Sequence, residues 1–236
     1  MLNVKLLQSM RIVSRILYFI IVIFCLAVII FNIPSVFMDS VRAYKMYLWF
    51  GCGALAYFLI MLIPPVRKNE KWLQTFSHEL THTIVGMMFF RKINSFQASD
   101  NGTGVIYHSG RRRFGSIFIS LAPYCFPIFT YLFMLLRILG SEEMYYVFDI
   151  FIGFTAAFHF TCFWRQTGNY QTDIQGQGYV RSYMFIAAWR LFNATIILLT
   201  IRMGIVDAVT YIFPEYWHTI VGWWDALTGW ISQLRS

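Results

Sequence analysis

Charged residues are scarce in this sequence. Aspartate, glutamate, lysine and arginine make up 13% of the 236 residues, whereas hydrophobic residues make up 58%. A soluble globular domain carries about 25% charged residues, so the composition argues against a soluble protein and predicts an integral membrane protein. We attribute the net charge of +8 to lysine and arginine at membrane edges and not to a nucleic-acid surface.

Cysteine is sparse as well. Cys25, Cys52, Cys125 and Cys162 each lie in an apolar run, and no two of them have a CxxC spacing. The pattern argues against a disulfide framework or a cysteine-based metal site and is typical of reduced packing residues. Acidic residues number only 11, so few carboxylates are available as metal ligands or general bases.

Long apolar runs provide the membrane spans. Because a helix needs about 20 mostly apolar residues to cross the hydrocarbon, we expect an all-α polytopic membrane protein with about six transmembrane helices. These helices are predicted at residues 15–37, 46–66, 70–90, 114–136, 144–164 and 179–202. Pro64-Pro65 ends the second run, and Asn69 suits the N-cap of the third helix.

Two segments differ from these runs. Polar and apolar residues alternate over Lys92–Ala98, turn-forming residues follow at Asp100-Asn101-Gly102, and a second strand pattern covers Gly104–Tyr107. This order predicts a small β-hairpin or sheet after the third helix. After Pro214, apolar and aromatic residues recur at helical spacing, which favours a C-terminal interfacial amphipathic helix over a seventh span.

The most informative pattern is His78-Glu79-Leu80-Thr81-His82, which reads HExxH. Two histidines four residues apart project from the same face of a helix, so both imidazoles can reach one zinc ion. The glutamate between them can hold a zinc-bound water and accept its proton. Polar side chains are costly within hydrocarbon, so this cluster indicates a functional site. The alternative to a metal site is a non-catalytic polar stripe that faces a channel or a neighbouring helix.

A catalytic zinc ion normally has three protein ligands, so one more donor is needed. Asp173 is our choice, because it lies in a glycine-flanked link before an apolar helix, where the helix dipole favours a carboxylate. Asp149 and His159 are the rivals, but they lie about 15 Å apart along one helix and cannot both bind one metal ion. One of them can still approach His78 from a neighbouring helix. A buried ion pair with Asp149 is one interpretation of Arg190, which lies in the last predicted span.

These residues give the chain a resemblance to the site-2 protease family of intramembrane zinc metalloproteases, in particular to its small bacterial-type, stand-alone members. The HExxH segment resembles the zinc-binding helix of that family, and residues 91–107 look like the strand-rich segment that follows it. Ser120-Leu121-Ala122-Pro123-Tyr124 is similar to the start of the next helix of the family. Asp173 falls 91 residues after His82, close to where compact members place their third ligand. Thr81 and Ile174 stand where the family has glycine.

The resemblance implies an intramembrane zinc metalloendopeptidase that cleaves transmembrane segments of membrane proteins with a zinc-activated water. Glu79 is then the catalytic base, and His78, His82 and Asp173 hold Zn²⁺. The strands are expected to hold an unwound substrate by strand addition. The expected substrate contacts are Ile93, Phe96, Val105 and Tyr107 on the strands, together with Asn169.

The chain is thus predicted to contain a two-helix membrane segment (1–66), a metalloprotease-like core (67–203) and an amphipathic, aromatic-rich tail (204–236). We expect a multi-pass protein of the bacterial cytoplasmic (inner) membrane. Its expected partners are a transmembrane protein substrate and the lipid bilayer, without nucleic acid, and the sequence leaves the oligomeric state open. Two alternatives stay open: a prenyl-processing-type membrane metallopeptidase that uses Glu142 or Glu143, and a non-catalytic zinc-binding membrane protein.

Overall fold

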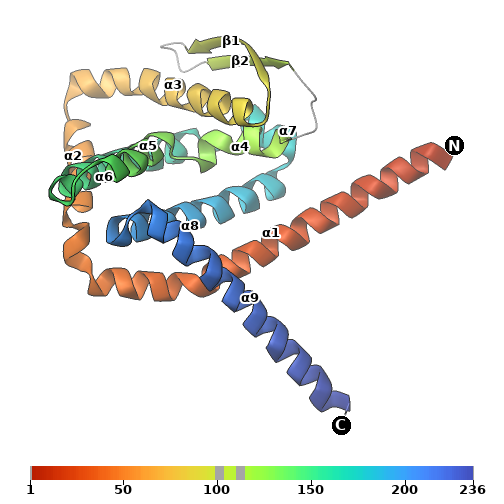
Figure 1. Cartoon of the computed structure of the whole chain (residues 1–236). Helices are drawn as coiled ribbons and strands as arrows, with labels where there is room; N and C mark the ends of the chain where they lie inside the picture. Colours follow the sequence, from red (N-terminus) through yellow and green to blue (C-terminus); the bar gives the residue numbers. More distant parts are fainter. Residues whose placement is uncertain (1, 99–103, 110–114, 236) are drawn as a thin grey trace.

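The protein is built mainly from helices that pack side by side (Figure 1). The computed structural model describes residues 2–98, 104–109 and 115–235. The helices are α1 (Leu2–Arg42), α2 (Leu48–Ile60), α3 (Pro64–Met88), α4 (Ser116–Cys125), α5 (Ile128–Leu136), α6 (Tyr145–Gln166), α7 (Thr172–Gln177), α8 (Tyr179–Met203) and α9 (Ile205–Arg235). Short 3₁₀ helices lie at η1 (Tyr44–Tyr47), η2 (Arg137–Leu139) and η3 (Glu142–Met144).

Two strands follow α3, in the region where the sequence predicts a hairpin. Strand β1 (Lys92–Ala98) pairs antiparallel with β2 (Gly104–Ser109), so that Phe96 lies opposite Ile106. The register shifts between Ile93 and Ser95. The predicted turn at Asp100-Asn101-Gly102 lies outside the described residues.

The described residues contain fewer candidate membrane spans than the sequence suggested. Three segments are long and apolar enough to span alone: Ile12–Arg42, Glu142–Gln166 and Tyr179–Met203. Two more spans exist only if bent pairs are counted, namely Tyr44–Ile60 with Pro64–Met88, at 107°, and Ser116–Cys125 with Ile128–Leu139, at 76°. The described residues therefore provide three to five candidate spans, and the expectation of six was wrong.

Proline explains both bends. Pro64 and Pro65 occupy the first turn of α3, where a missing N–H breaks no helical hydrogen bond. Helix α3 therefore begins before residue 70, and Asn69 lies inside it instead of at its N-cap. Pro127 is the N-cap of α5 and separates it from α4, so the run at 114–136 is not one straight helix.

Helices α2 and α6 cross at very short range. A Cβ atom at Gly53 would lie 1.9 Å from the carbonyl oxygen of Ile150, and one at Gly153 would lie 1.9 Å from that of Phe50. Small residues allow such a close approach of two backbones, which is a common way of packing helices in membranes. This crossing fixes α2, and the chain then turns directly into α3.

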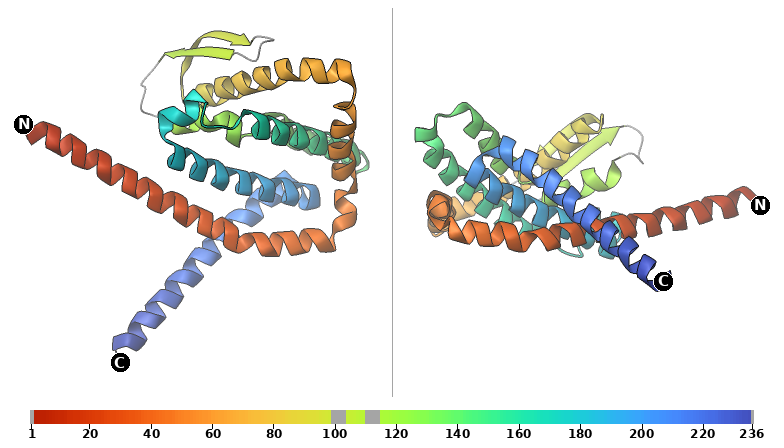
Figure 2. Two further views of the ribbon diagram at one scale, coloured as in Figure 1. Left: turned by 180° about the vertical axis from the view of Figure 1, so that it is seen from behind. Right: turned by 60° about the horizontal axis from the view of Figure 1, so that its bottom comes forward.

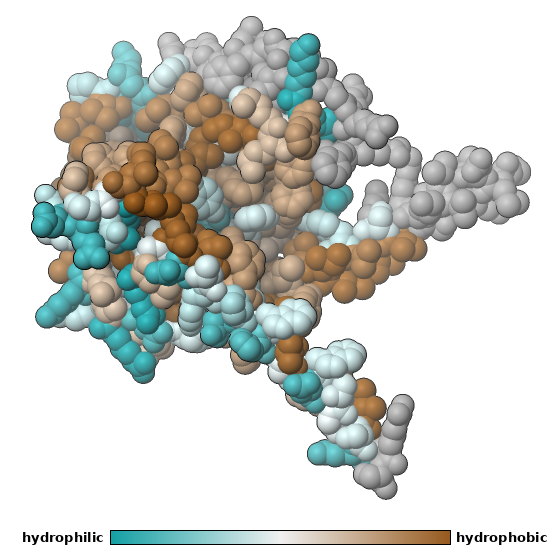
Figure 3. All heavy atoms as spheres, viewed as in Figure 1, coloured by the Kyte–Doolittle hydropathy of each residue, from teal (hydrophilic) through white to brown (hydrophobic). Residues whose placement is uncertain are grey.

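Helices α1 and α9 extend away from this packed body in different directions (Figures 1 and 2). They contact each other through Trp223, whose ring meets Phe24 and Phe31 edge to face. Tyr18 links α1 to α8 by donating a hydrogen bond to the carbonyl oxygen of Arg181, at 3.2 Å. Hydrophobic residues cover much of the visible surface (Figure 3), as expected of helices that face lipid.

Candidate metal centre

Helix α3 carries the HExxH segment and turns it towards the inside of the protein. Glu79 and His82 are 7% and 8% exposed, whereas Met87 and Met88 on the other side are exposed. Val85 anchors this inner face against α4 by packing on Ile119 and Ala122. The polar stripe of α3 therefore points at α4 and not at lipid.

A buried polar contact fixes the beginning of α3. Glu70 accepts a hydrogen bond of 2.7 Å from the Tyr57 hydroxyl of α2 and forms an ion pair with Arg165 of α6. The Glu70 side chain is almost fully buried, so its charge requires these partners. These contacts join α2, α3 and α6 at the beginning of α3.

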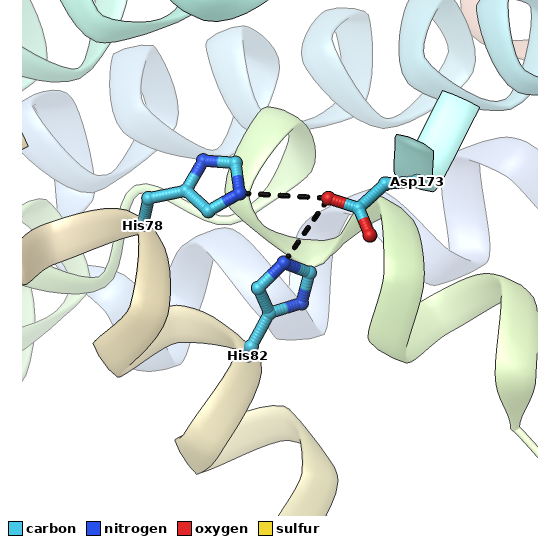
Figure 4. A group of neighbouring side chains, drawn as sticks. All are labelled: His78, His82 and Asp173. Carbon is cyan, nitrogen blue, oxygen red and sulfur yellow. Dashed lines mark ion pairs between the residues drawn. The ribbon is translucent and has the colours of Figure 1, made fainter. Parts of the chain in front are cut away.

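His78, His82 and Asp173 come together at one point (Figure 4). The Nε2 atoms of His78 and His82 lie 3.5 Å and 3.3 Å from the Oδ2 atom of Asp173. One donor atom from each of the three residues lies within 4.8 Å of the other two. This grouping of two imidazoles and a carboxylate fits a divalent transition metal such as zinc.

Asp173 reaches the histidines from α7, a helix of six residues. Ile174 is fully buried and packs with Tyr124 and Phe185, which holds α7 against α4 and α8. The Ser182 hydroxyl donates a hydrogen bond of 3.2 Å to the carbonyl oxygen of Ile174. The position of the Asp173 carboxylate therefore depends on the packing of α7 against α4 and α8.

The histidines keep Asp173 ionised. Burial acts to raise the pKa of its carboxyl group, but hydrogen bonds and charge from His78 and His82 outweigh burial, and the pKa lies below the usual value for aspartate. The carboxylate is therefore the form present at neutral pH. A metal ligand must be deprotonated in the same way, so the side chain is ready to bind a cation.

A hydrogen bond to α4 sets the orientation of His82. Its Nδ1 atom lies 2.7 Å from the carbonyl oxygen of Ile119. A carbonyl oxygen only accepts, so Nδ1 carries a proton, and Nε2 is the nitrogen that faces Asp173 and the centre. A metal ion that displaces the proton between Nε2 and Asp173 would meet the tautomer that a metal-binding histidine needs.

The rival ligands lie elsewhere. Asp149 pairs with Arg137 at 3.0 Å, so the predicted pairing of Asp149 with Arg190 is wrong. His159 lines a cavity of about 270 Å³ together with Arg190 and Asn193. The guanidinium of Arg190 lies 3.7 Å above the ring of Phe163. The structure brings neither Asp149 nor His159 to the histidine pair.

The structure describes the side chain of only one of the predicted substrate contacts, Asn169. Asn169 is exposed, and its Oδ1 atom accepts a hydrogen bond of 3.0 Å from the Tyr183 hydroxyl. The strands carry the backbone of Ile93, Phe96, Val105 and Tyr107, but their side chains lie outside the described part of the structure. Residues 111–113 also lie outside it.

One member of the centre received no role from the sequence. Tyr124 of α4 lies edge to face with His78, with ring centroids 5.4 Å apart and planes at 82°. The residue is 1% exposed. Its place directly after Pro123, in a segment of small residues, was a weak signal, because such a tyrosine is more often simple packing.

Comparison with known protein families places most of the chain in one of them. A sequence model described as Peptidase M50B-like matches residues 50–209, from α2 into the first turns of α9. The matched range includes the HExxH segment and Asp173. No curated protein and no solved structure matches the chain.

Proposed function

The chain belongs to the Peptidase M50B-like family, whose model matches more than half of it, and from this premise we propose that it is an intramembrane zinc metalloendopeptidase. The family and the apolar helices make it an integral membrane protein and a site-2-protease-type membrane metallopeptidase. The proposal adds the metal, the catalytic residues and the substrate. The convergence of His78, His82 and Asp173 on one point supports it most.

These three side chains would hold the zinc ion. The donor set fits the metal, because both Nε2 atoms and one carboxylate oxygen face a common point and the proton of His82 is fixed on its other nitrogen. When bound, zinc supplies a Lewis acid that polarises a peptide carbonyl group and acidifies water.

Glu79 is the proposed general base. It lies between the two histidines on α3, is nearly buried, and interacts electrostatically with His82, His78 and Asp173. Its carboxylate accepts a proton from the attacking water and later passes that proton to the leaving amine. A residue placed between the ligands on a rigid helix has the fixed position that this transfer requires.

The proposed substrate is a transmembrane segment of another membrane protein. A helical substrate hides its peptide bonds in its own hydrogen bonds, so it must unwind before hydrolysis. The β1–β2 hairpin packs against α3 and has a free strand edge in the described two-stranded sheet, to which an unwound chain can add. On the resemblance to bacterial-type members, we place the reaction in the bacterial cytoplasmic membrane.

The decisive experiment replaces Glu79 by glutamine. We expect purified Glu79→Gln protein in proteoliposomes to bind as much zinc as the wild type and to cleave transmembrane reporter peptides about 10²- to 10⁴-fold more slowly. Metal content is measured by mass spectrometry and cleavage by gel analysis of labelled peptides.

Glu143→Gln is the matched control, because Glu143 is exposed and belongs to the prenyl-processing alternative. It should retain both zinc and cleavage. Full cleavage by Glu79→Gln would contradict the catalytic assignment, and loss of zinc from Glu143→Gln would favour the alternative. Wild-type protein without zinc would favour a non-catalytic role or a different metal.

A further inference from the structure

The Tyr124 hydroxyl group is buried beside the metal centre without a settled partner. It makes no hydrogen bond of standard geometry, its ring packs with Ile174, the residue after Asp173, and the Asp173 carboxylate interacts with it electrostatically. Glu79 also lies within electrostatic range of it. Leaving a hydroxyl group unpaired in the interior is costly, so a small movement that pairs it with a neighbouring acceptor is favoured.

The surroundings of Tyr124 keep its ring in place. Its edge-to-face contact with His78 fixes one side, and Ile174 and Phe185 belong to the same buried cluster. Neighbouring Leu121 and Cys125 are fully buried as well. The hydroxyl group is therefore held between the HExxH helix and α7, with little freedom to turn elsewhere.

Asp173 is the ligand that most needs support. The two histidines stand on a helix of 25 residues, whereas Asp173 stands on one of six residues. The side chain of Asp173 is 26% exposed, compared with 10% for either histidine. One of its oxygen atoms faces both imidazoles and the other points away from them (Figure 4). Rotation of this carboxyl group would remove an oxygen from the centre.

We infer that Tyr124 is a positioning residue, whose phenol donates a hydrogen bond to the Asp173 carboxylate and holds it towards His78 and His82. The inference rests on the proposed metal-dependent function. A phenol donates one proton and a carboxylate accepts several, so the bond leaves lone pairs free for a cation. The hydroxyl oxygen is inaccessible to solvent, so Tyr124 acts through Asp173 and does not touch the substrate.

The test is Tyr124→Phe in the full-length protein, because phenylalanine keeps the ring contact with His78 and removes only the hydroxyl group. The affinity for Zn²⁺ is measured by competition with a chelator, and the visible spectrum is recorded with Co²⁺ in place of Zn²⁺. We expect about 10- to 100-fold weaker Zn²⁺ binding, the usual loss when an outer partner of a ligand is removed. The Co²⁺ spectrum should shift, which a purely structural role would not produce.

Tyr216→Phe is the matched control. Tyr216 also carries a buried hydroxyl group without a hydrogen bond, but it packs on the cluster around Ile196 and Leu199. Its replacement should leave both the metal affinity and the spectrum unchanged. If Tyr124→Phe does not fold, 3,5-difluorotyrosine at position 124 keeps the ring and the hydroxyl group and should still shift the Co²⁺ spectrum.

Each outcome separates the inference from the proposed function. Wild-type protein that binds neither ion refutes the metal centre itself. Wild-type protein that binds zinc, with Tyr124→Phe equal to it in affinity and spectrum, overturns the positioning role and leaves the proposed function intact. An unchanged Co²⁺ spectrum with the fluorinated residue overturns it as well.

Discussion

The Nε atom of Arg137 lies 3.0 Å from the Oδ1 atom of Asp149, and the two side chains are only 9% and 7% exposed. Arg137 also donates hydrogen bonds to the carbonyl oxygens of Thr200 and Ile201, at 3.2 Å and 3.3 Å. Arg137, which follows α5, is therefore joined to α6 by the ion pair and to α8 by these hydrogen bonds. The ion pair gives Asp149 a structural role, away from the metal centre.

Removing one partner of this pair should destabilise the protein. Asp149→Asn leaves the Arg137 charge buried without a counter-ion, and we expect the free energy of unfolding in detergent micelles to fall by about 3–5 kcal/mol. The double variant Arg137→Met/Asp149→Leu should recover most of this loss, because neither charge then remains. Arg42→Gln removes an exposed pair with Asp39 and should cost less than about 1 kcal/mol. Equal losses from Asp149→Asn and Arg42→Gln would contradict the buried pair.

The crossing of α2 and α6 predicts a contrast between two glycines of α2. Gly53→Ala places a methyl group against the Ile150 carbonyl oxygen, so we expect a loss of about 1–3 kcal/mol in unfolding free energy. Gly51→Ala meets nothing within 4 Å and should be neutral or stabilise the helix by up to about 1 kcal/mol. Reversible unfolding in mixed micelles measures both. If the two variants behave alike, α2 does not cross α6 as described.

Metal content discriminates between the candidate third ligands. Asp173→Ala removes a donor atom that faces both histidines, and zinc affinity should fall by more than the roughly 10- to 100-fold that loss of an outer partner costs. His159→Ala should retain wild-type affinity, because His159 lines the cavity beside Arg190. Zinc stoichiometry and chelator competition on purified protein measure both variants. Loss of zinc from His159→Ala alone would move the site to α6.

The proximity of His78, His82 and Asp173 was easier to predict from the sequence than the number of membrane spans. His78 and His82 lie on one helix, so their four-residue spacing alone predicts that both imidazoles project from the same face. The family match has confirmed the resemblance that this motif suggested. The scarcity of acids left few candidates for the third ligand, and the glycine-flanked position of Asp173 favoured it, but only the packing of α7 could bring its side chain to the histidines. The partner of Asp149 could not be read at all, because contacts between separate helices leave no trace in local spacing.

Spans were overestimated for a related reason. Hydropathy averaged over a window does not register a change of direction, so the runs around Pro64 and Pro127 looked like whole helices. The prolines themselves were visible, but the bend angles depend on what each half packs against. Tyr124 shows the same limit, because its hydroxyl group gains significance only from the neighbours that the fold assembles around it.

The distance along the chain between α3 and α7 has a consequence for biosynthesis. His82 leaves the ribosome 91 residues before Asp173, with α4, α5 and α6 still to be made. A nascent chain therefore holds two donors without the third until α7 has emerged and docked. Assembly of the proposed zinc site therefore follows synthesis of the HExxH helix, and it depends on the packing of Ile174 against Tyr124 and Phe185.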